Sequence, residues 1–335
     1  MLHSGRARAT KGTPMAAVRR APQDYRERMR ACAQALGLKP PEIVMPGDRW
    51  VRLNGIDCHY LDWGNPHLPH VVLLHGGGLT AHTWDMAALL LRDRYHLVAL
   101  DQRNHGDSEW TPDGQLERDG GELMLEDTRQ FLEHLGYDHC ALAGMSMGGM
   151  NAIRYAARHP QRLDALVIVD VGPQLMREGT LEISQFVRDV ETMDRFEDFL
   201  ARAVQFNPQR KPDHLAYSLW HSLRETGDGR WTWKQAPRRG AQTREPSEQE
   251  LAEARERNTQ RLWAAVRAIR TPTLLMRGSI SRVLAQDAAE AMVAAMHDAR
   301  LVVIEGAGHS VQGDQPQAFA SALDAFVSSR VQRRG

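Results

Sequence analysis

Short apolar runs alternate with longer amphipathic segments along most of this chain, and that alternation limits the possible folds more than any other feature. Runs that are apolar throughout are typical of strands buried on both faces, and the amphipathic segments between them are typical of helices that cover those faces. The order predicts a mostly parallel, doubly wound α/β sheet. Two strands are expected within 51–61 and single strands at 71–74, 95–100, 141–145, 165–169, 273–276 and 301–304, with helices that include 122–135, 148–158 and 285–296.

Composition argues against several functional classes. The 335 residues include 42 Lys and Arg against 42 Asp and Glu, so the chain has no net charge with which to attract nucleic acid. Cys32, Cys58 and Cys140 form no closely spaced pair, which predicts neither disulfides nor a metal site and favours a reduced, cytoplasmic protein. The longest apolar stretches, such as 165–171, are far shorter than the roughly 20 residues that span a bilayer, so no membrane partner is expected.

The alternation also divides the chain into parts. Residues 1–45 are expected to be an N-terminal extension, basic at first and then helical, without the apolar run of a secretory signal. Residues 46–172 and 270–335 would form the α/β core. The interval 173–269 has no clear strand, and a structureless loop of that length is implausible in a compact domain. We therefore expect it to be a helical cap folded over one end of the sheet.

The sharpest motif is Gly144-Met145-Ser146-Met147-Gly148, which follows an expected strand and opens an expected helix. A nucleophilic serine needs this strand-to-helix turn, because the turn projects its hydroxyl while the small glycines let neighbouring backbone approach. A glycine-rich turn without a function is the alternative. The context favours Ser146 as a nucleophile.

Two further loops would lie at the same edge of the sheet. His75-Gly76-Gly77-Gly78 follows an apolar run, and the N–H groups of Gly77 and Met147 are candidates for an oxyanion hole. A simple turn before a helix is the alternative. Gly306-Ala307-Gly308-His309 follows the last expected strand. Its histidine comes after Ser146 in the chain, as it must in hydrolases whose catalytic residues follow the order serine, acid, histidine. His75 is expected to brace its own loop, and His105 to belong to a structural turn.

These motifs resemble those of the α/β-hydrolase superfamily, over residues 50 to about 329. The run from Asp101 to Ser108, which reads DQRNHGDS, is similar to a mostly architectural loop of esterase-like members. The resemblance implies an eight-stranded core, a cap inserted after strand six, and a mechanism with serine, histidine and an acid that needs no cofactor and no metal.

The acid departs from the family pattern. Close relatives carry it in segments that resemble RGxxSDVL, whereas residues 277–284 read RGSISRVL, with Arg282 in the place of the aspartate. A cation cannot orient the imidazole or stabilise the imidazolium. Some members instead place the acid at the end of strand six, and the residue there is Asp170. In such members a serine can occupy the usual acid site, so Ser281 is a candidate residue to assist the acid. Asp170 could instead be structural or pair with Arg282; Asp287 is the fallback acid, and a missing acid is the third alternative.

The favoured function is a serine hydrolase that cleaves a carboxylic ester, thioester or lactone. Haloalkane dehalogenases and epoxide hydrolases need a carboxylate nucleophile, which Ser146 is not. A carbon–carbon bond hydrolase and a non-catalytic ligand-binding protein stay open as alternatives. The cap tryptophans, with Met145 and Met147, predict a largely hydrophobic pocket for an acyl or aromatic group, and so an apolar ester with a small or medium-length chain as substrate. The sequence leaves a homo-oligomer open. The tryptophans are Trp220, Trp231, Trp233 and Trp263.

Overall fold

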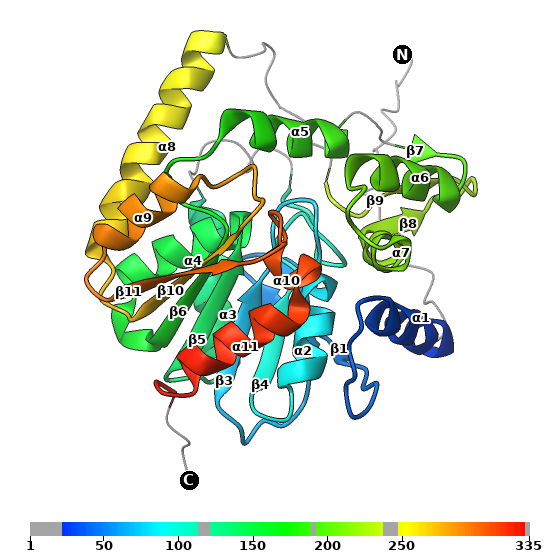
Figure 1. The fold of residues 1–335 in the computed structure, drawn as a ribbon, viewed down its shortest axis with the longest axis horizontal. Coiled ribbons are helices and arrows are strands. Elements are labelled where there is room, and N and C mark those ends of the chain that lie inside the picture. Colours follow the sequence, from blue (N-terminus) through cyan, green and yellow to red (C-terminus); the bar gives the residue numbers. More distant parts are fainter. Residues whose placement is uncertain (1–21, 113–120, 189–191, 237–246, 332–335) are drawn as a thin grey trace, which may run out of the picture.

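The chain folds around one eight-stranded sheet with helices on both faces (Figure 1). The computed structural model describes residues 22–112, 121–188, 192–236 and 247–331. The basic start of the chain lies outside these ranges. Residues 238–247, which are rich in charged and turn-forming residues and are expected to form an exposed loop, also lie almost entirely outside them. Among the described residues, no helix combines the length and the apolarity that a membrane span requires.

The sheet confirms the expected fold class. Its strand order is β1-β2-β4-β3-β5-β6-β10-β11, with β1, β2 and β4 paired antiparallel and all other neighbours parallel. The strands are β1 (Gly47–Leu53), β2 (Ile56–Asp62), β3 (His70–Leu74), β4 (His96–Leu100), β5 (Cys140–Met145), β6 (Leu163–Val169), β10 (Thr273–Gly278) and β11 (Ala299–Ile304).

Each face of the sheet has its own hydrophobic core. One core joins the strands to α2 (Asp85–Leu91) and α11 (Pro316–Val327). The other core joins them to α3 (Glu122–His134), α4 (Met147–Arg158), α8 (Glu248–Ala268) and α9 (Gln286–Ala294). The central strands are buried because both faces are covered, whereas β11 is partly exposed because it lies at the edge of the sheet.

The segment between β6 and β10 differs from the helical cap that we expected. It has helices α5 (Arg177–Arg188), α6 (Phe196–Phe206), α7 (Pro212–Ser222) and α8, but also an antiparallel sheet of β7 (Thr192–Met193), β9 (Trp231–Trp233) and β8 (Leu223–Glu225). The prediction of a segment without strands was therefore wrong. The sequence pattern of 182–193 also indicates one helix, but α5 covers only its first part, 182–188, and its last two residues form β7. We refer to residues 173–269 as the cap.

The helix α1 (Pro22–Ala35) lies against α7 of the cap, as Figure 1 shows, and close to α2. Met29 and Cys32 on α1 are fully buried. The Tyr25 hydroxyl donates to Asp85 Oδ2 at 3.0 Å, and the Tyr217 hydroxyl of α7 donates to the same oxygen. One buried carboxylate of α2 thus joins α1, the core and the cap.

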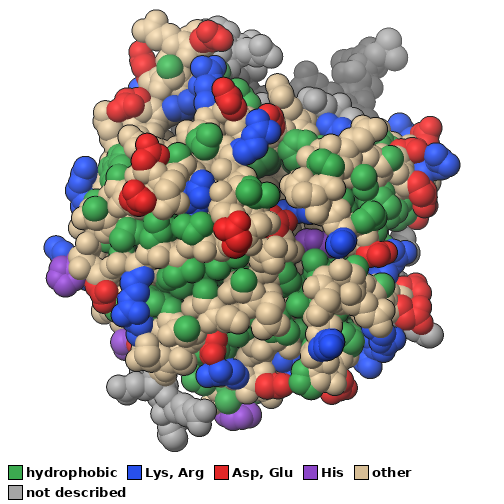
Figure 2. Space-filling model, in the orientation of Figure 1, with side chains coloured by type: hydrophobic (Ala, Val, Ile, Leu, Met, Phe, Trp, Pro, Cys, Tyr) green, Lys and Arg blue, Asp and Glu red, His purple; other side chains and the backbone are tan. Residues whose placement is uncertain are grey.

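Short elements complete the chain. These are two 3₁₀ turns, η1 (Ala81–Trp84) and η2 (Pro160–Arg162), and the helical turn α10 (Val311–Asp314). On the face drawn in Figure 2, acidic and basic side chains are interspersed with apolar ones, in keeping with the zero net charge. The three cysteines are buried and free.

Candidate active site

Ser146 lies at the sharp turn between β5 and α4. Its backbone has φ of 53° and ψ of −117°, which a residue with a Cβ adopts only at a cost of about 1–3 kcal/mol. The turn is held by the Ser146 N–H, which donates to the Val169 carbonyl at 3.1 Å. It also requires close backbone contact, since a Cβ on Gly148 would lie 2.3 Å from the Leu74 carbonyl oxygen. These features are those expected for a nucleophile elbow.

Asp170 follows β6, the strand beside β5, and its side chain is fully buried. Its Oδ2 lies 2.8 Å from His309 Nδ1 and accepts the Ser281 hydroxyl at 2.5 Å. Its Oδ1 accepts the Gly278 N–H at 3.0 Å. The structure therefore brings together Asp170, His309 and Ser281, three of the residues that the sequence singled out.

The carboxylate determines which nitrogen of His309 carries a proton. An ionised carboxylate can only accept hydrogen bonds, so Nδ1 of His309 must donate and Nε2 is left as the basic nitrogen. The His309 side chain is 16% exposed, so it is partly accessible to substrate, while Asp170 is shielded from water. This arrangement suits a histidine that takes a proton from a nucleophile.

The other candidates for the acid lie elsewhere. Arg282 is exposed and pairs with Glu182 of α5 at 2.7 Å, so the pair of Asp170 with Arg282 that we considered is not formed. Asp287 is exposed in the first turn of α9, and its carboxylate accepts the Ala288 N–H at 2.8 Å.

The loop after β3 lies beside the elbow. A Cβ on Gly76 would meet Met145 Sδ at 2.5 Å and Ser146 Cβ at 3.2 Å, so a side chain there would displace Met145. Gly77, the first of the two oxyanion candidates, is exposed in this loop. Met147, the second, is the first residue of α4, where a backbone N–H has no partner within its own helix. The loop and the helix start can together present two N–H groups.

Two buried histidines support this loop. His75 Nε2 accepts the Gln102 N–H at 2.9 Å and its Nδ1 donates to the Gly76 carbonyl at 2.8 Å. Burial lowers the pKa of His75, so the ring is neutral and can hold both bonds. His105 Nδ1 lies 3.0 Å from the Arg103 carbonyl, within the turn that follows β4. Both histidines therefore have the structural surroundings that the sequence suggested.

Cap residues approach the same loop, and the sequence carried no signal for them. An ideal Cβ on Gly78 would lie 3.2 Å from Val187 Cγ2 on α5 and 3.5 Å from Gln235 Oε1. Gly78 avoids this contact and also has a φ of +77°. The cap thus lies against the glycine-rich loop at Gly78, next to the oxyanion candidate Gly77.

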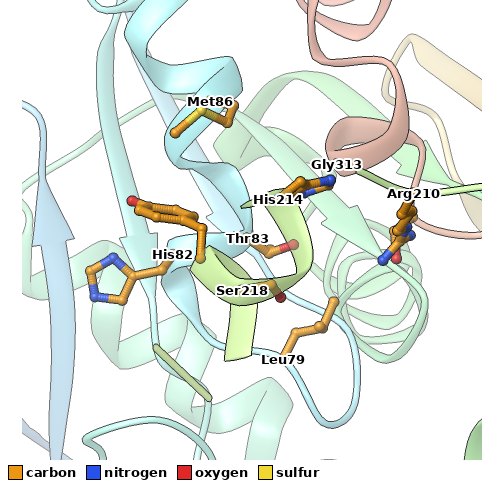
Figure 3. Close-up of a pocket in the computed structure, with 10 residues that line it drawn as sticks. Leu79, His82, Thr83, Met86, Arg210, His214, Ser218 and Gly313 are labelled. Atoms are coloured by element: carbon orange, nitrogen blue, oxygen red, sulfur yellow. The ribbon is translucent and has the colours of Figure 1, made fainter. Parts of the chain in front are cut away.

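A small cavity of about 20 Å³ lies where the cap meets the core, next to the loop that carries His309 (Figure 3). A space of that size holds about one water molecule. Met86 of α2, Ser218 of α7 and Gly313 of α10 lie on three of its sides, with Arg210 at the edge. The remaining lining residues are Leu79, His82, Thr83, His214, Tyr217 and Ser310.

The cap tryptophans, which suggested an apolar pocket, pack elsewhere. Trp231 and Trp233 belong to the hydrophobic core of the cap, where Trp233 meets Phe199 edge to face. Trp220 packs against Tyr25 of α1, and Trp263 against the core under α8. Among the described residues, these tryptophans pack helices and strands against one another, so they do not indicate what the substrate is.

Two clusters away from Ser146 bring histidines and carboxylates close enough to share a metal ion. In the first, atoms of His82, Asp85 and His221 lie within 4.8 Å of one another; in the second, His59 and Asp101 do so with Asp107. Hydrogen bonds already join their members, at 2.9 Å between His82 and Asp85 and 2.8 Å between His59 and Asp101. Of the third members, the His221 ring stacks on His82 with ring centroids 3.5 Å apart, and the Asp107 carboxylate pairs with Lys234 at 2.8 Å.

Comparison with known proteins identifies related sequences and structures. The family model described as alpha/beta hydrolase fold matches residues 69–316. Esterase Rv0045c of Mycobacterium tuberculosis is 31% identical over 277 residues, which cover 81% of this chain and 86% of that protein. The sn-1-specific diacylglycerol lipase ABHD11 of Mus musculus is 28% identical and covers 79% and 83%. A crystal structure of the Mycobacterium tuberculosis esterase has a TM-score of 0.70 at 26% identity, covering 92% of this chain and 99% of that one.

Proposed function

The chain belongs to the α/β-hydrolase family, and on that premise we propose that it is a serine hydrolase that cleaves a carboxylic ester, thioester or lactone through an acyl-enzyme. One observation carries the proposal: the buried Asp170 carboxylate lies 2.8 Å from His309 Nδ1, at the edge of the sheet where the elbow presents Ser146. The relatives named as an esterase and a lipase agree with ester hydrolysis.

The proposed mechanism assigns one task to each group. Nε2 of His309 takes the proton of the Ser146 hydroxyl while its oxygen attacks the substrate carbonyl. The N–H groups of Gly77 and Met147 stabilise the oxyanion, and one such donor is typically worth about 2.7–4 kcal/mol in the transition state. Asp170 holds the required tautomer and stabilises the imidazolium. Ser281 donates to Asp170 and so helps to hold the carboxylate in place.

The second half of the reaction uses the same groups in reverse. His309 gives its proton to the departing alcohol or thiol, and a water molecule then enters. His309 removes a proton from this water as it attacks the acyl carbonyl, which releases the acid and restores the Ser146 hydroxyl. No step needs a cofactor in this proposal.

An active-site label tests the proposal directly. A fluorophosphonate probe should label the wild-type protein and a Ser328→Ala variant, in which an exposed serine is lost, but not Ser146→Ala. The wild-type protein and Ser328→Ala should also hydrolyse p-nitrophenyl acetate, whereas Ser146→Ala should not. A folded wild-type protein that stays unlabelled and inactive would favour a non-catalytic binding protein instead.

For the substrate we propose a small, apolar ester. The proposal depends on Met147 and Val187, whose apolar side chains lie next to Gly77 and Gly78, and on Leu79, which lines the small cavity. A panel of p-nitrophenyl esters should show faster hydrolysis of short apolar acyl groups than of charged ones, with about 1–3 kcal/mol of discrimination per methylene-sized change. A preference for anionic or sugar-like esters would contradict it.

A further inference from the structure

A largely shielded ion pair joins the cap to the loop that carries His309. Arg210 lies in the turn between α6 and α7, and its Nε donates to Asp314 Oδ1 at 2.5 Å. The two side chains are 16% and 6% exposed. Their positions in the sequence are 104 residues apart, so the contact depends on how the cap sits on the core.

The second oxygen of Asp314 holds the histidine loop itself. Oδ2 accepts the backbone N–H of Gly308, the residue immediately before His309, at 2.8 Å. The fit is close, since a Cβ on Gly308 would lie 3.1 Å from the same oxygen. One carboxylate therefore contacts the cap with one oxygen and the backbone next to His309 with the other.

A second contact at this seam shows that α7 lies directly on α10. A Cβ on Gly313, the neighbour of Asp314, would lie 3.2 Å from Cε1 of His214 on α7. Burial, followed by the charge of Arg210, lowers the pKa of His214 to about 4, so this ring is neutral near pH 7 and leaves Arg210 as the cation that faces Asp314.

Burial makes this pair different from the exposed pairs of the cap. Arg195 and Asp198, for example, pair at 2.8 Å with side chains 70% and 39% exposed, and such pairs contribute little because water screens them. A buried carboxylate that loses its cation is strongly disfavoured, so it must move or take up a proton. Movement of Asp314 would release the Gly308 N–H.

We propose that Asp314 and Arg210 are positioning residues for His309: Asp314 fixes the backbone beside the histidine, and Arg210 of the cap fixes Asp314. The inference rests on the proposed function, since it assigns the two residues to the same reaction. Its consequence is that His309 is held in its working position when the cap is seated on the core. Arg210 acts through Asp314 and not by contact with substrate.

Kinetics and amide exchange test the proposal together. Asp314→Ala should lower kcat about tenfold, because it removes a charge-assisted hydrogen bond and a buried ion pair, while KM stays nearly constant. Arg210→Ala should lower kcat by a smaller factor, and the double variant should be no worse than Asp314→Ala because both residues act through one path. Hydrogen exchange of the Gly308 amide should be faster in both single variants.

Two further variants control the experiment. Asp314→Asn keeps an oxygen that can accept the Gly308 N–H but loses the charge that Arg210 pairs with, so its kcat should resemble that of Arg210→Ala. Arg195→Ala removes an exposed cation from the same cap and should leave kcat, KM and the Gly308 exchange rate unchanged.

Three results would overturn the proposal. A rise in KM at constant kcat for Arg210→Ala would show that Arg210 contacts the substrate. A lower melting temperature with normal kcat and normal Gly308 exchange would show an ordinary stabilising pair. If the losses of kcat in Arg210→Ala and Asp314→Ala multiply in the double variant, the two residues affect His309 independently of each other. If the wild-type protein has no esterase activity, the proposed function fails, but the exchange measurement still decides whether Arg210 and Asp314 hold the loop.

Discussion

Asp170 accepts three hydrogen bonds, and its replacement by asparagine changes what each of the three donors meets. The donors are the Nδ1–H of His309, the hydroxyl of Ser281 and the N–H of Gly278. An asparagine side chain has one accepting oxygen, so in either orientation its NH₂ faces at least one of them. With the NH₂ at the Oδ2 position, Nδ1 of His309 must accept, and the ring proton moves to Nε2.

A proton on Nε2 prevents His309 from accepting the proton of Ser146. We therefore expect Asp170→Asn to lower kcat by at least about 10²-fold, and by as much as ~10⁴-fold if the wrong tautomer dominates. Stability should change little, since the shape of the side chain is kept and the Ser281 hydroxyl can rotate to a new acceptor.

Steady-state hydrolysis of p-nitrophenyl acetate measures the effect, with Ser146→Ala as the baseline. Asp287→Asn is the matched control, because it makes the same chemical change at an exposed position on α9. The reasoning is refuted if Asp287→Asn is the damaging change and Asp170→Asn keeps nearly wild-type turnover.

Three other variants test separate parts of the structure. Arg282→Asp should leave activity unchanged or lower it, because Asp170 already holds Nδ1 of His309 and the new carboxylate would replace an exposed cation that pairs with Glu182; a large gain in kcat would show that the usual acid position is the productive one. Ser281→Ala should lower kcat about tenfold with KM unchanged, through loss of a hydrogen bond to a charged group, and a normal kcat would remove Ser281 from the mechanism. Burial lowers the pKa of His59, but hydrogen bonds to Asp101 and Asp48 outweigh it and raise the pKa to about 9. Protonated His59 therefore stabilises the folded state fully below its unfolded pKa near 6.5, and this stabilisation is lost as the pH rises to about 9. Urea unfolding should show a loss of about 3 kcal/mol over that range in the wild type and a much smaller one in His59→Gln.

Local patterns in the sequence predicted the core of the fold well. Except at the start of β1, which begins at Gly47 and not at 51, each expected strand begins and ends within one or two residues of an observed one, because apolar runs bounded by turns have few alternatives in a parallel sheet. The resemblance predicted a cap after β6, and the chain between β6 and β10 includes the helices α5, α6, α7 and α8. The small sheet of β7, β9 and β8 was missed because its strands have two or three residues, too few to show any period.

The candidate site was predictable where it depends on neighbours in the sequence. The turn at Ser146 and the loop at His309 are local, and Arg282 in the usual acid position directed attention to Asp170. The contact between Arg210 and Asp314 joins distant segments, and nothing in either segment indicates its partner. The tryptophans carried an apolar signal, but only the fold determines which core they fill.

The contact of α1 with the rest of the protein bears on where the smallest stable unit begins. The family model starts at residue 69, which omits α1, β1 and β2. A fragment cut at that point would leave Asp85 without the Tyr25 hydroxyl, expose the surface that Met29 and Cys32 cover, and leave β4 as an open edge of the sheet. An unpaired strand edge beside an apolar surface promotes aggregation. The family model is therefore narrower than the unit that these contacts join into one core.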